Sequence, residues 1–284
     1  MYKGLTPAGL GQVGGLEQFV RLASRNRFQA VDTDGTSLEM LISARGKEGA
    51  LAFLNEHQVK IGAIGLSVEW RNTEEQFRSG LDRLVQDAKA AAELGVTACC
   101  TYVLPSTDWN PARFMAVATR RLRTCAEILG AYNIRLGLEF VGPHHLRTKW
   151  KHPFIWDMAD TLEWIDAIHA PNVGLLLDCY HWHTTGATVE DLLKLDKSQI
   201  VHVHINDAPA VPVEEALDNE RLYPGEGVID LVGFLKALRQ IGYNGVVSQE
   251  VLLPQPPTES PETLAAKSAA LFDRLYAAAG ISPQ

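Results

Sequence analysis

Short apolar runs rich in β-branched residues alternate with segments of helical periodicity along the whole chain. We predict strands at residues 3–6, 29–32, 60–66, 98–104, 134–140, 173–178, 200–206 and 245–250. Most of them are followed by a segment whose apolar positions recur at helical spacing. These helices are predicted at 16–26, 37–57, 73–95, 111–132, 157–169, 188–195, 230–241 and 258–279. Such alternation predicts a parallel sheet with its helices outside.

Eight strand–helix units most simply close into one α/β barrel of the (β/α)8 or TIM type, with an open doubly wound sheet as the alternative. No linker, charge block or low-complexity stretch marks a boundary, so we predict a single domain over residues 1–284. Two long irregular segments, 141–156 and 207–229, follow the fifth and seventh strands. In a barrel both lie at the C-terminal face, where active-site loops gather.

Four successive strands end in a carboxylate or an imidazole. The fifth ends near Glu139, the sixth at Asp178, the seventh near His204 and the eighth at Glu250. In a closed barrel these ends converge at one mouth. Two Glu, one Asp and one His suit Mn²⁺, Mg²⁺ or Co²⁺ better than a structural zinc, and three buried carboxylates without a cation would repel one another. The alternative is that each residue caps a strand or pairs with a nearby Lys or Arg.

The strand ends belong to longer motifs. These are Gly137-Leu-Glu139, Leu177-Asp178-Cys-Tyr-His181, His202-Val-His204-Ile-Asn-Asp207, Pro224-Gly-Glu-Gly-Val-Ile-Asp230 and Gln249-Glu250. Together they resemble the xylose isomerase-like barrel family, and within it the sugar isomerase and epimerase branch with ketose 3-epimerases, hydroxypyruvate isomerase and inosose dehydratase. The resemblance covers nearly the whole chain. It implies one divalent metal, Mn²⁺ first and Mg²⁺, Co²⁺ or Zn²⁺ otherwise, bound by Glu139, Asp178, His204 and Glu250.

The resemblance also implies roles for individual side chains. Glu139 and Glu250 would flank the substrate as acid/base groups, and His181 and Arg221 match positions that contact substrate oxygens. Ketose 3-epimerases carry a second glutamate six residues after the strand-five glutamate. That position is His145 here, and a histidine can serve as a general base near neutral pH, so we predict that it is catalytic. Separately from the resemblance, Trp109 follows the fourth strand and suits stacking on a sugar face, with core packing as the alternative.

The chemistry of this residue set points to proton transfer beside a carbonyl group. A metal chelated by a carbonyl and the adjacent hydroxyl acidifies the C–H between them, and a carboxylate can remove that proton and return it elsewhere. We therefore expect a divalent-metal-dependent isomerase or epimerase of a small sugar or keto-polyol. The histidine at position 145 raises an alternative, a lyase or dehydratase that acts by β-elimination on a 3-keto sugar, 3-keto glycoside or inosose. A non-catalytic barrel subunit and a DNA-repair endonuclease are weaker alternatives.

The composition of the chain limits the kinds of partner that it can bind. The chain has 26 basic and 34 acidic side chains, and its net charge of −8 argues against sequence-independent binding of nucleic acid. No apolar run approaches the roughly 20 residues of a membrane span, and the start of the chain lacks a signal-peptide apolar region. The four cysteines show no paired-ligand spacing. We predict a cytoplasmic protein that acts on a small molecule, with a homodimer, a homotetramer or a partner subunit left open.

Two further features admit more than one interpretation. Gly9-Leu-Gly11-Gln-Val-Gly14, with Asp32 eighteen residues beyond, spells a dinucleotide-binding fingerprint. That fingerprint needs an apolar strand running directly into the first glycine, and Pro7 intervenes, so we interpret the segment as the first strand–helix loop. His202 lies two residues before His204 and shares its face of the strand. It is either a partner of the ligand histidine or a core histidine.

Overall fold

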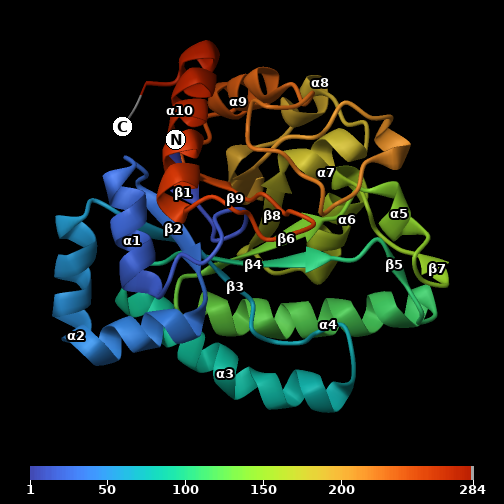
Figure 1. Cartoon of the computed structure of the whole chain (residues 1–284). Coiled ribbons are helices and arrows are strands. Elements are labelled where there is room, and N and C mark those ends of the chain that lie inside the picture. Colours follow the sequence, from blue (N-terminus) through green and yellow to red (C-terminus); the bar gives the residue numbers. More distant parts are fainter. Residues whose placement is uncertain (283–284) are drawn as a thin grey trace.

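Parallel strands form a closed barrel at the centre of the molecule (Figure 1). The computed structural model describes residues 1–282. The barrel strands are β1 (Tyr2–Leu5), β2 (Ala30–Thr33), β3 (Lys60–Gly65), β4 (Ala98–Val103), β6 (Arg135–Phe140), β8 (Val173–Asp178), β9 (Ile200–Ile205) and β10 (Val246–Gln249). Because β1 pairs with both β2 and β10, the sheet has no free edge. The predicted (β/α)8 barrel is confirmed, and the open sheet is excluded.

Helices surround the strands and lie close to their predicted positions. They are α1 (Leu16–Arg25), α2 (Gly35–Glu56), α3 (Glu74–Glu93), α4 (Pro111–Gly130), α6 (Met158–Ile168), α8 (Val189–Leu192), α9 (Leu231–Gln240) and α10 (Pro261–Ala279). Two of them differ from the sequence prediction. A left-handed residue, Gly46, with φ of 69°, interrupts α2, and α8 is a single turn.

Polar residues at the starts of the helices determine where several of them begin. The side chain of Asp34 accepts a hydrogen bond from the Ser37 amide at the start of α2, and Thr73 forms a capping box with Gln76 at the start of α3. Such caps satisfy backbone amides that have no partner within the helix. The apolar helix faces then pack on the strands, with Phe19, Leu84 and Phe234 fully or almost fully buried.

The C-terminal face of the barrel carries elements that the sequence analysis treated as irregular. Segment 141–156 contains α5 (His144–Arg147) and β7 (His152–Pro153), and β7 pairs antiparallel with β5 (Ser106–Thr107). Segment 207–229 contains the 3-10 helix η2 (Val213–Glu215), and α7 (Cys179–Thr184) directly follows β8. Among residues 1–282, no helix is both long and apolar enough to cross a membrane.

Segment 207–229 is folded around a buried carboxylate. The two oxygens of Asp207 accept hydrogen bonds of 2.9 Å from the amides of Gly225, Gly227 and Ile229. Asp207 also pairs with Leu222 through backbone hydrogen bonds. The segment is therefore a defined loop that places Arg221, next to Leu222, beside the barrel mouth.

Candidate metal centre

The fold brings the four predicted metal ligands together at the C-terminal end of the barrel. His204 Nδ1 lies 3.5 Å from Glu250 Oε2, 3.6 Å from Glu139 Oε1 and 3.9 Å from Asp178 Oδ2. One ligand atom from each side chain lies within 4.8 Å of the others. Each residue is at or beside the end of its strand, β6, β8, β9 or β10, so the closure of the barrel is what gathers them.

The donor atoms of this cluster fit a divalent cation. Glu139 Oε1 and His204 Nδ1 are buried and have no hydrogen-bond partner in the described part of the chain. Leaving a buried polar atom unpaired costs about 1–3 kcal/mol. Three carboxylates and one imidazole form an oxygen-rich ligand set, which Mn²⁺ and Mg²⁺ prefer and Zn²⁺ also accepts. A bound cation would supply the missing partner to both atoms.

A buried arginine already partly neutralises the cluster. Arg221 Nη1 donates to Asp178 Oδ2 at 2.9 Å and to Glu250 Oε2 at 3.0 Å, and Nη2 donates to Asp218 Oδ1 at 2.8 Å. His181 Nε2 lies 3.3 Å from Arg221 Nη2. Of the predicted substrate contacts, Arg221 therefore lies directly beside two predicted ligands and orients their carboxylates, and His181 lies beside Arg221.

The environment separates the proton affinities of the two glutamates. Burial raises the pKa of Glu139, against the influence of His204, and the negative charges of Glu250 and Asp178 raise it further. Burial also acts to raise the pKa of Glu250, but the positive charges of His204 and Arg221 outweigh it and lower that pKa to about 2. Pairs of titratable groups with separated pKa values are typical of acid/base sites.

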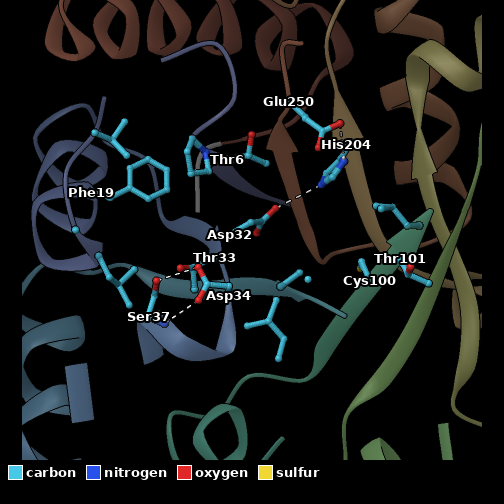
Figure 2. A pocket seen from close by; sticks show the side chains of 18 of the residues that line it. Thr6, Phe19, Asp32, Thr33, Asp34, Ser37, Cys100, Thr101, His204 and Glu250 are labelled. Atoms are coloured by element: carbon cyan, nitrogen blue, oxygen red, sulfur yellow. Dashed lines mark hydrogen bonds and ion pairs between the residues drawn. The ribbon is translucent and has the colours of Figure 1, made fainter. Parts of the chain in front are cut away.

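A cavity of about 800 Å³ opens beside the cluster, within the usual range for small-molecule sites. Figure 2 shows His204 and Glu250 on one side, Phe19 on the other, and Asp32 and Asp34 between them. Within residues 1–282, no lysine or arginine lines this cavity, although several carboxylates do. The lining therefore favours an uncharged molecule rich in hydroxyl groups over an anion.

Several predicted site residues do not line this cavity. Asp178, His181 and Arg221 are buried in or beside the cluster, and His145 and Trp109 lie elsewhere. His145 lines a separate shallow pocket with His144, Arg147, Thr148 and Glu214. Trp109 packs against Phe114, with ring centroids 6.5 Å apart, and lines a groove between α3 and α4. The catalytic role of His145 and the sugar-stacking role of Trp109 stay predictions, and neither residue meets the metal cluster in this geometry.

Sequence reasoning considered Asp32 only as part of the dinucleotide-type pattern, and Asn206 only as a residue that orients the ligand histidine or the loop; neither was predicted as a site residue. Asp32 is buried on β2 and lines the cavity, and Asn206 Nδ2 donates to both oxygens of Asp178 at 3.1 and 3.2 Å. The signal for Asp32 was present, because it follows the apolar pair Ala30 and Val31 on a short strand. That is the same pattern as in the strands that end in predicted ligands.

The comparisons with known proteins agree with this architecture. The family model described as xylose isomerase-like TIM barrel matches residues 20–275, and the chain belongs to this family. A xylose isomerase domain protein from Alicyclobacillus acidocaldarius has a solved structure that is 35% identical, with a TM-score of 0.90 and 99% of each chain covered. The crystal structure of the IolI protein with a bound zinc atom is 22% identical, with a TM-score of 0.79, and covers 98% of this chain and 99% of that one.

Relatives with curated names include inosose isomerases, 3-dehydroshikimate dehydratases and a ketose 3-epimerase from Arthrobacter globiformis that is 27% identical over 70% of this chain and 65% of the relative. An inosose isomerase from Halalkalibacterium halodurans is 28% identical over 210 residues, which are 72% of this chain and 70% of the relative. A 3-dehydroshikimate dehydratase from Pseudomonas aeruginosa is 28% identical over 181 residues, 62% of this chain but only 27% of that longer protein. These similarities support an enzyme of the sugar isomerase, epimerase and dehydratase type.

Proposed function

We propose that the chain is a divalent-metal-dependent isomerase or epimerase of a small, uncharged sugar or keto-polyol. The observation that carries this proposal is the convergence of Glu139, Asp178, His204 and Glu250, with two of their donor atoms buried and unpaired. The inosose isomerase relative supports a cyclic keto-polyol as the first substrate class to test. The zinc atom of the IolI structure supports a cation in this type of barrel, with Mn²⁺ our first choice from the ligand set.

The two glutamates would transfer the proton. Glu139, Asp178, His204 and Glu250 would hold the divalent cation, whose chemistry there would be to polarise a substrate carbonyl and so lower the pKa of the adjacent C–H. Glu139 and Glu250 are the proposed proton acceptor and donor, because both carboxylates line the cavity beside the cluster. In the barrel order β8 and β9 separate β6 from β10, so the two carboxylates approach a bound molecule from different sides. Proton return from the second side gives epimerisation, and return to the neighbouring carbon gives isomerisation.

The surrounding residues would bind and orient the substrate. Arg221 and His181 are the proposed contacts for substrate oxygens, because Arg221 donates to Glu250 and Asp178 and His181 lies 3.3 Å from Arg221, although neither is among the lining residues of the cavity. Their positions also mean that Arg221 keeps the Glu250 carboxylate in a fixed orientation. A base held in this way reaches the same proton in every turnover.

The charge of the cavity argues against the substrate named for the dehydratase relative. 3-Dehydroshikimate is a carboxylate, and away from the metal cluster and Arg221 the cavity, within residues 1–282, offers it no cationic side chain. The lining carries Asp32, Asp34, Glu139 and Glu250, and none of the described lining residues is a lysine or an arginine. An uncharged inosose or ketose avoids this repulsion.

The proposal is tested with metal-loaded protein and a panel of inososes and ketohexoses in D₂O, followed by NMR. We expect an isomer or epimer with deuterium at the carbon beside the carbonyl. The substitution Glu250→Gln should lower kcat by about 10²–10⁴-fold, whereas Glu259→Gln, at an exposed position between β10 and α10, is the matched control. Full activity without metal or an unimpaired Glu250→Gln variant would overturn the proposal. Loss of water from the substrate would assign the lyase alternative instead.

A further inference from the structure

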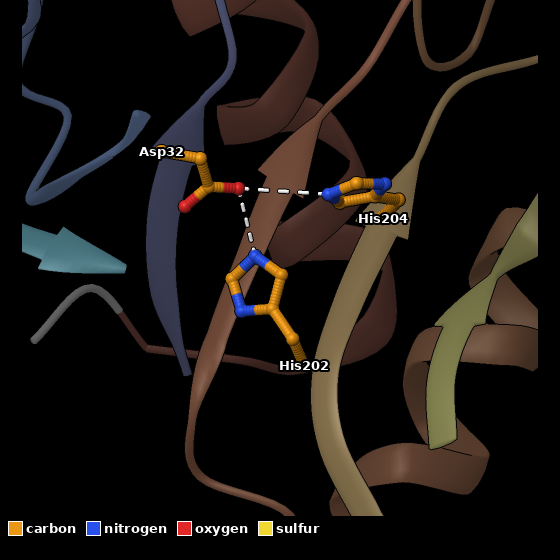
Figure 3. A group of neighbouring side chains, drawn as sticks. All are labelled: Asp32, His202 and His204. Atoms are coloured by element: carbon orange, nitrogen blue, oxygen red, sulfur yellow. Dashed lines mark hydrogen bonds and ion pairs between the residues drawn. The ribbon is translucent and has the colours of Figure 1, made fainter. Parts of the chain in front are cut away.

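A second buried cluster adjoins the predicted ligands and shares His204 with them (Figure 3). Asp32 Oδ2 lies 2.8 Å from His202 Nε2 and 3.6 Å from His204 Nε2. The two imidazole rings are nearly perpendicular, at 84°, with centroids 5.4 Å apart. Asp32 comes from β2 and both histidines come from β9, so this contact spans the barrel interior.

His204 presents its two ring nitrogens to different partners. Nδ1 faces Glu139 and Glu250, whereas Nε2 faces Asp32. A histidine that binds a metal through one nitrogen carries its hydrogen on the other, and a carboxylate facing that second nitrogen keeps the hydrogen there. The charge of Asp32 therefore favours the tautomer of His204 whose Nδ1 lone pair is free for a cation.

The barrel interior has space for the Asp32 carboxylate because a neighbouring strand carries a glycine beside it. Gly62 lies on the neighbouring strand β3, and a Cβ atom at this position would overlap Asp32 Oδ1 and approach His202 Cε1 to 3.4 Å. Asp32 Oδ1 is buried and has no hydrogen-bond partner among the described residues, so both imidazoles depend on Oδ2. His202, only 1% exposed, holds that oxygen in place.

We propose that Asp32 is a positioning residue that fixes the ring orientation and tautomer of His204, with His202 holding Asp32. This inference rests on the metal site of the proposed function. A second cation bound by Asp32, His202 and His204 is the competing interpretation. It fits less well, because the 2.8 Å hydrogen bond between Asp32 and His202 occupies the atoms that a second ion would need.

The test measures metal binding rather than turnover. Titration calorimetry with Mn²⁺ and with Zn²⁺ should give one ion per wild-type chain, and Asp32→Asn should weaken its affinity about 10–100-fold. The nitrogen-15 NMR spectrum of the Zn²⁺-loaded wild type should place the His204 hydrogen on Nε2. Asp87→Asn is the matched control, because Asp87 is a buried carboxylate on α3 that pairs with Arg83 away from the cavity. This control should bind metal as the wild type does.

A second variant keeps the inference testable if Asp32→Asn does not fold. His202→Gln removes the partner of Asp32 but leaves the carboxylate facing His204, and it should weaken metal binding measurably, by about 2–10-fold. Unchanged affinity in Asp32→Asn, or in His202→Gln where only that variant folds, would overturn the inference. So would two ions per wild-type chain. If affinity falls as expected but no keto-polyol is converted, the proposed function fails while the positioning role stands.

Discussion

Arg221 and Glu250 are joined by a hydrogen bond of 3.0 Å between Nη1 and Oε2, and the same nitrogen lies 2.9 Å from Asp178 Oδ2. The guanidinium is almost completely buried, at 2% exposure. One cation thus compensates two of the three carboxylates in the predicted ligand set. The metal-free chain can therefore fold with these acids close together.

We predict that Arg221→Met destabilises the metal-free chain by about 3–5 kcal/mol, because buried carboxylates lose their cation. Saturating Mn²⁺ should stabilise this variant more than the wild type, since the metal would replace the missing charge. Urea unfolding with and without Mn²⁺ measures both effects. Arg83→Met is the control, because Arg83 pairs with the buried Asp87 on α3 and its loss should not depend on metal. The same metal-induced stabilisation in Arg221→Met and wild type would contradict the prediction.

Two glycine substitutions on β3 test whether Asp32 needs the space beside Gly62. One adds a Cβ atom against Asp32, and the other adds it elsewhere on the same strand. Gly62→Ala places a Cβ against Asp32 Oδ1, so we expect a loss of about 1–3 kcal/mol of stability and weaker Mn²⁺ binding. Gly65→Ala is on the same strand, and no described atom lies within 4 Å of its added Cβ. We expect this control to change stability by less than about 0.5 kcal/mol. Equal effects of the two substitutions on stability and metal affinity would show that Asp32 does not need this space.

The acidic lining predicts discrimination against anions. A carboxylated analogue of a bound keto-polyol should bind at least tenfold more weakly than the neutral compound. Asp34→Asn removes one negative charge from the cavity, so the ratio of the two binding affinities should fall several-fold. The asparagine still caps α2. Asp230→Asn is the matched control, because Asp230 caps α9 and does not line the cavity. Competitive inhibition constants for both analogues give the comparison, and an unchanged ratio in Asp34→Asn would count against the charge argument.

A pH-dependent contribution to stability is predicted where α10 meets β1. Lys3 Nζ is 2.8 Å from Asp273 Oδ1, and Arg27 Nη2 is 2.9 Å from Oδ2. The hydrogen bond from Lys3 lowers the pKa of Asp273 below its ordinary 3.8, and the positive charges of Lys3 and Arg27 lower it further. The stabilisation is therefore complete above pH 3.8 and is lost as the pH falls through the lowered pKa.

Asp273→Asn tests this contribution. Because the carboxylate is partly exposed and screened by solvent, we expect a loss of only about 1 kcal/mol at pH 7. The difference between variant and wild type should stay constant from pH 7 to pH 5 and shrink below pH 3.8. Urea unfolding across this pH range provides the measurement. A difference that grows as the pH falls would reverse the assigned sign.

The strand ends could be predicted because each strand is an apolar run that the sequence shows directly, and eight such strands alternating with helices close into a barrel. Apolar runs located the strands to within one or two residues, and parallel closure then placed Glu139, Asp178 and Glu250 at one mouth. The position of His145 was not predictable in this way. It depends on α5 and on the pairing of β5 with β7, which are contacts between a loop and a distant segment. Asp32 was missed because its partner His202 lies 170 residues away.

Anomalous diffraction at the manganese edge, on crystals grown with Mn²⁺, tests whether the four strand-end side chains bind the metal. We predict one anomalous peak per chain, bonded to Glu139, Asp178, His204 Nδ1 and Glu250. The peak should be absent from crystals grown with a chelator. A peak bonded to Asp32 and His202 instead, or no peak within the barrel mouth at saturating Mn²⁺, would contradict it.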